Sequence, residues 1–417
     1  MSNDATHVGY RDLTAALSAA APGATLTIKG TCVASNVTGG NADFVIWHDV
    51  TLKGVANKVF GTPTLMGTGE RTVVEVVGST VTLIGLTIAG AGGNYSSGGL
   101  FNDHGVVTIV NSTVTGNSAW TAAGIGNNGT MVLSHSTISD NTAVYGGGGI
   151  YNAGTLTMTD SEVSGNTSTL GAAGGIFNFN NCVDEGSGIL TVANSTFSGN
   201  TAAQWGGAIF NQGYWNTYVE RSCLGAVTLT DSTISDNTAG WNGGGINNVG
   251  IAAIDGSIVS GNKATNGAGI ANMANPNADP ATLAITDSTV GDNTTTGVGG
   301  GILNGLGPST SILTVTGSTV SGNAAVHGAG ILNWGSATIS GSTISANTAA
   351  YVGGIVNAGA LTFVAPTTTV GGNVGAATGG VQNGPGTVTG GCPTILGGQV
   401  LYDPANTPPD FSGFTCP

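Results

Sequence analysis

The chain has 417 residues, with 7 Lys or Arg against 21 Asp or Glu, which gives a formal charge of −14 at pH 7. This balance excludes nucleic acid as a partner, because binding to phosphates depends on Lys and Arg. No apolar run reaches the ~18 residues that a membrane-spanning helix needs. Only 7% of the residues are charged, so Thr, Ser, Asn and Gly must cover the surface, as we expect of an extracellular or cell-surface protein.

Residues 1–60 are predicted to form an N-terminal cap and the first strands. Met1 leads into polar residues and not into an apolar secretion signal, so we expect a mature or recombinant form. Leu13 and Leu17 lie four positions apart and predict a short helix over residues 11–21, and the alternation at Leu26 and Ile28 predicts a strand. This helix should cover the first turn of the fold, whose open end would otherwise expose apolar core.

Residues 61–390 repeat one unit of about 24 residues. Variants of S-T-V-S-G-N are followed by G-G-G-I-x-N and then by L-T-V-T, and longer copies contain insertions that we assign to loops. Two series of Asn set the register, and we expect each series to stack as a hydrogen-bonded ladder. The first series is Asn117, Asn141, Asn166, Asn200, Asn237, Asn262, Asn293, Asn323, Asn347 and Asn373, and the second is Asn102, Asn127, Asn152, Asn178, Asn211, Asn248, Asn272, Asn304, Asn333, Asn357 and Asn383.

Each unit contains three short alternations of apolar and polar residues, separated by turn residues and without a helical period. In one unit Leu313, Val315 and Val320 point inward, while Thr314 and Thr319 point away. Such a unit cannot bury its apolar face alone and must stack on its neighbours. The sequence therefore predicts an all-β fold, a right-handed parallel β-helix (solenoid) of about eleven coils with three strands per coil. Despite its length, we expect one elongated domain.

Two motifs resemble the repeats of a known family. Residues 206–209 spell GGAI and residues 197–200 spell FSGN, which resemble the GGA[ILV] and FxxN repeats of the polymorphic membrane protein adhesins. The resemblance covers residues 86–385 and implies a right-handed β-helix with an adhesin-like role at a cell surface. The organisation is also similar to the wider pectate-lyase-like group, which implies polysaccharide-active enzymes as an alternative.

Aromatic residues recur at two positions of the repeat, a turn between the two Asn series and the middle of the I-x-N strand. The middle residue alternates away from the inward Ile, so we predict an outward apolar stripe. We interpret this stripe as a stacking platform for an extended extracellular polysaccharide or surface ligand. Cover for the turn backbone, burial against a loop, or a homo-oligomer contact would give the same pattern. The expected ligand-binding residues are Trp120, Tyr145, Tyr151, Phe177, Trp205, Phe210, Tyr214, Trp215, Tyr218 and Trp241.

Insertions at residues 178–190, 211–227, 272–283 and 304–313 all interrupt the turn that follows the aromatic strand. We expect them to form a wall beside the stripe, because recognition is often built from loops on a rigid scaffold. The first two carry carboxylates that permit a second hypothesis, glycoside hydrolysis by two carboxyl groups roughly 5–9.5 Å apart. A polyuronate lyase is less favoured because cations are scarce. The candidate catalytic residues are Asp184, Glu185, Glu220 and Arg221.

The cysteines suggest two disulfides. Cys182 and Cys223 lie in the two longest insertions, and Cys392 and Cys416 bracket the tail over residues 391–417, which we expect to cap the C-terminal end. Cys32 is left over. No Cys/His cluster predicts a metal site or cofactor. Scattered Asp residues at turns favour turn capping over a calcium ladder, with isolated calcium sites left open.

A third hypothesis rests on outward hydroxyl groups. Thr and Ser recur on one face of the third strand and resemble the T-x-T faces of solenoid ice-binding proteins. Thr is also a favourable residue on any exposed strand, and Glu162 and Ile258 interrupt the series. The residues expected to contact ice are Thr113, Thr137, Thr196, Thr233, Thr319 and Thr343.

Overall fold

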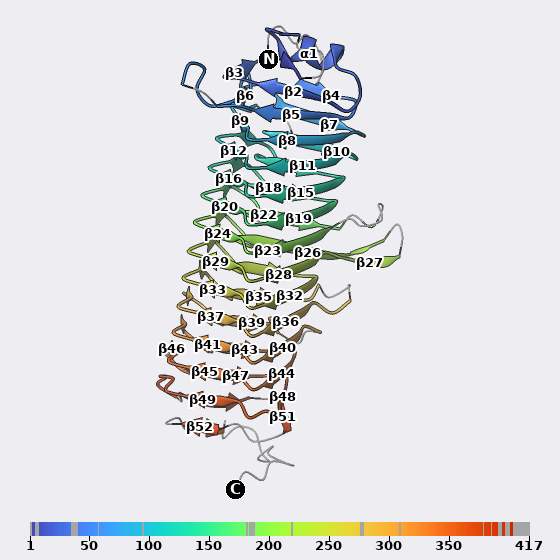
Figure 1. Cartoon of the computed structure of the whole chain (residues 1–417). Coiled ribbons are helices and arrows are strands. Elements are labelled where there is room, and N and C mark those ends of the chain that lie inside the picture. The colour runs from blue at the N-terminus through green and yellow to red at the C-terminus, as the bar shows by residue number, and fades with distance from the viewer. Residues whose placement is uncertain are drawn as a thin grey trace. The chain divides into compact units, whose positions relative to one another are not determined.

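The computed structural model describes residues 2–4, 8–34, 41–56, 58–93, 96–180, 182, 188–217, 220–275, 279–307, 310–377, 379–384, 386–390, 394–396 and 401–402. The chain divides into two compact units, Met1–Thr201 and Ala202–Pro417. Each unit is a stack of parallel strands, which confirms the predicted all-β parallel β-helix (Figure 1).

Unit 1 begins with the predicted helix. Helix α1 (Leu13–Ala19) starts at Asp12, whose side chain accepts a hydrogen bond from the Thr14 amide at 3.1 Å, a typical N-cap. Leu13 and Leu17 are buried, as their spacing predicts. The strand around Leu26 and Ile28 is β2 (Ala24–Ile28), which pairs antiparallel with β1 (Ser2–Asn3) on one side and parallel with β5 (Val50–Gly54) on the other.

Three parallel sheets run through unit 1, one for each predicted alternation. The first contains β2, β5 (Val50–Gly54), β8 (Thr80–Ile84), β11 (Val106–Val110), β15 (Thr130–Ser134), β19 (Thr155–Thr159) and β23 (Ile189–Ala193). The second contains β4 (Ala42–Ile46), β7 (Thr72–Val77), β10 (Leu100–Asp103), β14 (Ile125–Asn127), β18 (Ile150–Asn152) and β22 (Ile176–Phe179). The third contains β3 (Thr31–Val33), β6 (Thr64–Met66), β9 (Thr87–Ala89), β12 (Thr113–Thr115), β16 (Thr137–Ser139), β20 (Glu162–Ser164) and β24 (Thr196–Ser198).

Unit 2 has the same three sheets. The first contains β28 (Ala226–Thr230), β32 (Ile251–Asp255), β36 (Thr282–Thr286), β40 (Ile312–Thr316), β44 (Ser336–Ser340), β48 (Ala360–Val364) and β51 (Thr387–Gly390). The second contains β26 (Ile209–Asn216), β31 (Ile246–Asn248), β35 (Ile270–Asn272), β39 (Ile302–Asn304), β43 (Ile331–Asn333), β47 (Ile355–Asn357), β50 (Val381–Asn383) and β53 (Leu401–Tyr402). The third contains β29 (Thr233–Ser235), β33 (Ile258–Ser260), β37 (Thr289–Gly291), β41 (Thr319–Ser321), β45 (Thr343–Ser345), β49 (Thr369–Gly371) and β52 (Thr394–Leu396).

A fourth, narrow sheet was not predicted. Its strands have two residues each and follow the first Asn series, where the sequence reads Thr-Ala in four of the nine described strands. Two residues are too few to show an alternation, so this sheet leaves no period in the sequence. Its strands are β13 (Ser118–Ala119), β17 (Thr142–Ala143) and β21 (Thr167–Ser168) in unit 1, β25 (Thr201–Ala202) at the boundary, and β30 (Thr238–Ala239), β34 (Lys263–Ala264), β38 (Thr294–Thr295), β42 (Ala324–Ala325) and β46 (Thr348–Ala349) in unit 2.

Both Asn series form the predicted ladders inside the coils. In unit 1, Asn141 is fully buried and its Nδ2 donates to Asn166 Oδ1 at 2.9 Å and to the Val114 carbonyl at 3.0 Å. Its Oδ1 accepts from the backbone amide and Nδ2 of Asn117 at 3.1 and 3.0 Å. Each amide side chain thus joins neighbouring coils and satisfies corner backbone groups that would otherwise be buried without partners.

A third ladder is made of serines that precede the third-sheet strands. The Ser112 amide donates to Ser136 Oγ at 3.2 Å, and the Ser136 amide donates to Ser161 Oγ at 3.1 Å. Unit 2 repeats the pattern with Ser232, whose amide donates to Ser257 Oγ at 3.1 Å. The repeat serine is therefore a buried structural residue and not part of the outward hydroxyl surface.

Acidic residues at two corners alternate with glycine over four successive coils of unit 2. Successive coils place Asp231, Gly256, Asp287 and Gly317 at the corner between the first and third sheets, all with positive φ. The corner after the third sheet repeats this order with Asp236, Gly261, Asp292 and Gly322. A Cβ on Gly256 would lie 2.6 Å from Asp231 Oδ1, so the carboxyl group covers the glycine of the next coil.

We expect Gly256→Ala to lower the free energy of unfolding by about 1–2 kcal/mol, because alanine is strained at φ +56° and its Cβ meets the Asp231 carboxylate. Gly116→Ala is the matched control, since Gly116 has φ +63° and open space where the added methyl group would lie. The Gly256 variant should be the less stable of the two in urea, and Asp231→Gly should recover part of its loss. Equal losses would show that the carboxylate contact is irrelevant.

Candidate ligand-binding clefts

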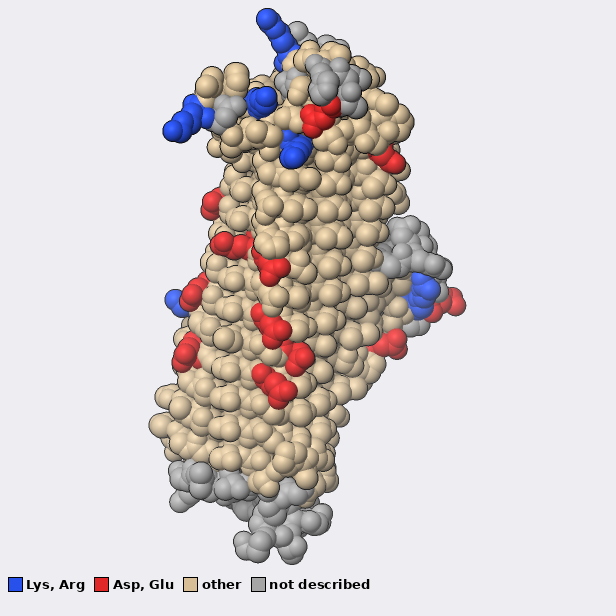
Figure 2. Space-filling view, viewed as in Figure 1, with Lys and Arg blue, Asp and Glu red and all other residues tan. Residues whose placement is uncertain are grey.

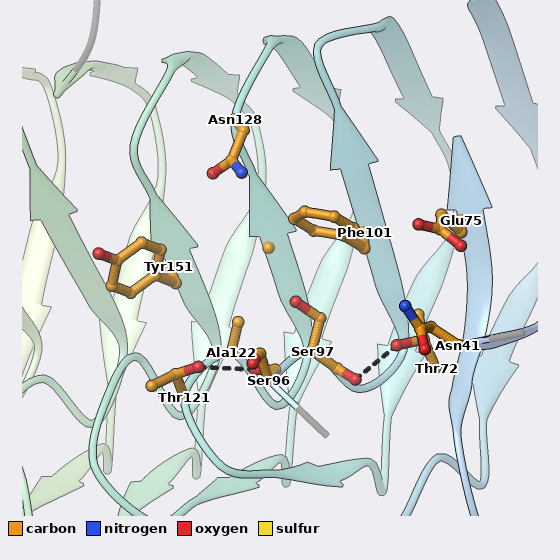
Figure 3. A pocket seen from close by; sticks show the side chains of 11 residues that line it. Asn41, Thr72, Glu75, Ser96, Ser97, Phe101, Thr121, Ala122, Asn128 and Tyr151 are labelled. Carbon is orange, nitrogen blue, oxygen red and sulfur yellow. Dashed lines mark hydrogen bonds between the residues drawn. The ribbon is translucent and has the colours of Figure 1, made fainter. Parts of the chain in front are cut away.

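The outward face of the second sheet in unit 1 has a gap in its aromatic series. Strands β10, β14 and β18 place Phe101, Gly126 and Tyr151 at the same register position. Gly126 has no side chain, so a cleft of about 450 Å³ opens between the two rings (Figure 3). Phe101 and Tyr151 are half-buried, and their backbone positions lie two strand spacings apart, roughly 9.6 Å. The Phe101 ring leans toward Gly126, since a Cβ there would lie 3.0 Å from Phe101 Cδ2 and 2.7 Å from Ser97 Oγ.

Polar groups surround this cleft in unit 1. Ser96, Ser97 and Thr121 come from the turns before the strands, and Asn128 follows β14. Thr121 Oγ1 donates to the Ser96 carbonyl at 2.8 Å, which fixes two turns against each other (Figure 3). Apolar ring faces with a rim of hydroxyl and amide groups are the usual composition of a small-ligand site.

Glu75 of β7 is the acidic residue among those that line this cleft. It lies beside Phe101 in the ladder, and no hydrogen bond or ion pair reaches its carboxyl group from the described residues. Burial, and secondly the nearby negative charge of Asp103, raise the pKa of Glu75 above its ordinary value. Asp103 itself contacts His104, with Oδ1 and Nδ1 2.6 Å apart. The cleft is therefore unfavourable for anionic ligands.

We expect Glu75→Gln to raise the Tm at pH 7.5. The pKa of Glu75 is higher in the folded than in the unfolded chain, so its ionisation destabilises the fold above the folded pKa. The gain from the variant should shrink as the pH falls through that raised value toward 4.5, the ordinary pKa of a glutamic acid. Thermal unfolding from pH 4 to 8 measures this, with exposed Glu162→Gln as control. A gain that is constant across this pH range would contradict the assignment.

Further aromatic residues extend the site within unit 1. Tyr151 and Phe177 are neighbours in the ladder, and their ring centroids lie 5.2 Å apart at 83°. Phe179 joins this cluster, 6.0 Å from Tyr151. In the preceding turns Trp120 and Tyr145 pack edge to face at 5.1 Å, and each is 45% exposed. Exposed aromatic pairs of this kind offer ring faces to a ligand.

Unit 2 has a second cleft, of about 330 Å³, beside Trp205. The Trp205 ring packs edge to face on Trp241 at 5.1 Å and lies 6.0 Å from the ring of Phe210. Asn247 occupies the ladder position after Phe210. The remaining lining residues carry no charge and are Gln212, Gly213, Asn242, Val249, Met273, Ala274 and Asn275.

The predicted stripe is covered over part of unit 2. Phe210, Leu303 and Leu332 are buried rather than outward-facing and exposed. The glycine turn before each strand folds over its middle residue, and a Cβ on Gly299 would lie 2.8 Å from Leu303 Cβ. At these positions the side chains pack against the turn backbone, which is one alternative interpretation of the outward apolar stripe. Exposed rings in unit 2 include Trp241 and Tyr351.

The insertion over residues 211–227 forms an antiparallel hairpin in unit 2, in which β26 pairs with β27 (Arg221–Leu224) (Figure 1). Tyr214 pairs with Cys223 and Trp215 with Ser222 in this hairpin. The Asp279 amide donates to Ser222 Oγ at 2.7 Å, so the insertion over residues 272–283 contacts the hairpin. A hydrogen bond thus joins these two insertions, and the wall beside the stripe stays a prediction.

The predicted catalytic residues fall only partly within the described ranges. Glu220 is exposed with φ +49° and precedes Arg221 at the start of β27. Asp184, Glu185 and the predicted ligand residue Tyr218 lie outside the described residues. The carboxylate separation on which hydrolysis depends therefore stays a prediction.

Cys182 and Cys223 are both disulfide-bonded, as predicted. Cys32 is a free, buried cysteine, and burial raises the pKa of its thiol. Cys392 and Cys416 lie outside the described residues. Across the described ranges, no group of three His, Cys, Asp or Glu side chains could hold a metal ion, and no helix is long and apolar enough to cross a membrane.

The Thr series lies in register on the third sheet. In unit 1, Thr113 pairs with Thr137, and Glu162 then separates Thr137 from Thr196. In unit 2, Ile258 separates Thr233 from Thr289, after which Thr319 and Thr343 continue the series. Ser139 Oγ donates to Thr115 Oγ1 at 3.2 Å, so some of these hydroxyls bond to each other.

Sequence reasoning missed three residues of these clefts. Gly126 is one of 74 glycines, although it stands where other coils carry Phe or Tyr. Asn247 stands beside the stacked Asn248, which hides it in the Asn series, and Glu75 lies near the N-terminal end of the repeats. A comparison of the middle I-x-N position across coils would have identified Gly126 and Asn247 as exceptions.

Comparison with known proteins gives one family. Residues 135–153 and 194–212 match the model of the Chlamydia polymorphic membrane protein repeat, and the second match contains both the FSGN and the GGAI motifs. The chain thus carries repeats similar to those of this family, on a parallel β-helix. No curated protein and no solved structure matches the chain.

Proposed function

We propose that this chain, whose repeats are similar to those of polymorphic membrane proteins, is an adhesin-like protein of the cell surface or extracellular space. We propose further that it binds an extended, uncharged glycan. The ligand lies along the outward face of the second sheet. The observation that carries this proposal is the cleft between Phe101 and Tyr151. Gly126 stands there at a position where the neighbouring coils have an aromatic residue.

Charge supports an uncharged ligand. Lys and Arg gather over the N-terminal elements, whereas acidic side chains are scattered over the coils (Figure 2). Between residues 72 and 390 the basic residues are Arg221 and Lys263, and neither lines a described cleft. An acidic glycan would meet Glu75 without a compensating cation.

The test is retention of oligosaccharides on the immobilised protein, with release of reducing ends measured in the same samples. We expect neutral glycans to be retained without turnover and polyuronates to pass through. Release of reducing ends that Glu220→Gln abolishes would instead support the hydrolase alternative. A protein that retains no glycan, or that self-associates through the clefts in sedimentation, would refute the proposal.

The ice-binding alternative has a separate test. Shaping of ice crystals by the purified protein, lost in Thr233→Tyr, would support it. Normal ice growth would eliminate it and leave glycan binding unaffected.

A further inference from the structure

Asn247 is a polar residue in an apolar series. The same ladder position holds Phe210 and Ala271 in the adjoining coils of unit 2, and Leu303 and Leu332 further on. Asn247 is 3% exposed, and its Oδ1 has no hydrogen-bond donor among the described residues. A buried acceptor without a partner destabilises a fold and calls for an explanation.

The neighbouring Asn242 offers the complementary group. Its Oδ1 accepts from Asn266 Nδ2 at 3.1 Å, which leaves Asn242 Nδ2 as a donor for which no acceptor is found among the described residues. Asn242 and Asn247 both line the Trp205 cleft. The Asn247 Oδ1 atom is buried, so a rotation of the Asn247 amide is needed to turn this acceptor toward the cleft. An acceptor and a donor placed there would match the N–H and C=O of a secondary amide.

The rest of the cleft adds apolar surface. Val249, Met273 and Ala274 are half-buried in its lining, and together they can cover a methyl group. Trp205 provides a ring face, held by its contact with Trp241. The lining carries no ionisable side chain, so an ammonium or carboxylate substituent would lose hydration without a charged partner.

We infer that the Trp205 cleft binds the 2-acetamido group of an N-acetylhexosamine. The amide N–H donates to Asn247 Oδ1 after a rotation of the Asn247 amide toward the cleft, and the acetyl C=O accepts from Asn242 Nδ2. The methyl group packs on Val249 and Met273, and the sugar ring lies on Trp205. This inference rests on the proposed glycan-binding function and names the sugar class for unit 2.

The test compares three tetrasaccharides by calorimetry with the full chain. The N-acetylglucosamine tetramer should bind about tenfold tighter than the glucose tetramer, which has a hydroxyl in place of the acetamido group, and tighter than the glucosamine tetramer, which has an ammonium. Asn247→Leu should remove this preference, so that the variant binds the N-acetylglucosamine and glucose tetramers about equally. Leucine is a matched replacement because Leu303 and Leu332 occupy the same position.

Two further measurements test the acetamido inference without relying on the Asn247→Leu variant. Asn247→Asp retains an oxygen acceptor and should retain more of the preference than Asn247→Leu. In saturation-transfer NMR of the unmodified protein, the acetyl methyl protons should receive the strongest transfer. Equal binding of the three tetramers, or weak transfer to the methyl group, would overturn the acetamido inference while glycan binding stands. Binding of no tetramer would refute both.

Discussion

Asn141→Asp should lower the free energy of unfolding by about 3–5 kcal/mol. The variant replaces Nδ2 by an oxygen that faces Asn166 Oδ1 and the Val114 carbonyl, at the 2.9 and 3.0 Å that Nδ2 now spans as a donor. Asn141 is fully buried, so the charged form is desolvated and the neutral acid can donate only one of the two hydrogen bonds. The loss should be smaller at acidic pH.

Urea unfolding followed by circular dichroism measures this effect, with hydrogen exchange at the Val114 and Ile138 amides to detect local opening. Asn111→Asp is the matched control, because Asn111 is an exposed corner residue with φ +49° at a position where Asp160 and Asp231 stand in other coils. We expect its effect to stay within about 0.5 kcal/mol. Similar losses for both variants would mean that the ladder adds nothing specific.

Tyr151→Ala should weaken binding of a neutral oligosaccharide at least about 30-fold if the unit 1 cleft holds it, since a central aromatic contact contributes about 2 kcal/mol or more. The truncation removes one wall of the cleft and the ring contact with Phe177. Affinity is measured by calorimetry, with circular dichroism to verify the fold.

Tyr351→Ala is the control for this loss. Tyr351 is 51% exposed and stacks on His327, with ring centroids 4.2 Å apart, outside both clefts. It tests whether any exposed ring contributes. Equal loss in the two variants would point to diffuse adhesion to aromatic surface, and no loss in Tyr151→Ala would exclude the cleft.

The fold could be predicted from the sequence because each coil repeats the same inward, corner and stacking residues. Inward Val, Ile and Leu, corner glycines and stacked Asn recur in the same order in successive coils, so the structure of one coil predicts that of the next. The narrow fourth sheet could not be predicted from the sequence, because two-residue strands such as Thr142–Ala143 are too short to show a period.

The clefts were less predictable for a different reason. The unit 1 cleft depends on what Gly126 lacks, and a missing side chain leaves no positive pattern in a glycine-rich chain. The unpaired Oδ1 of Asn247 depends on hydrogen-bond geometry that a sequence does not contain. Burial of Phe210 and Leu303 by their own turns likewise follows from the backbone path and not from residue type.

The alternation of Asp and Gly at the corners sets a longer period than the coil. With Asp231 and Asp287 two coils apart, their backbone positions are separated by roughly 9.6 Å, beyond the ~8 Å Debye length at physiological ionic strength. An Asp in every coil would halve this spacing and bring like charges within the unscreened range. The alternation covers four coils, because Gly341 follows Gly317 and Ala346 follows Gly322 at the same two positions. Duplicating an Asp coil alone would place two of these corner carboxylates on neighbouring coils, whereas duplicating an Asp coil together with its Gly coil would keep them two coils apart.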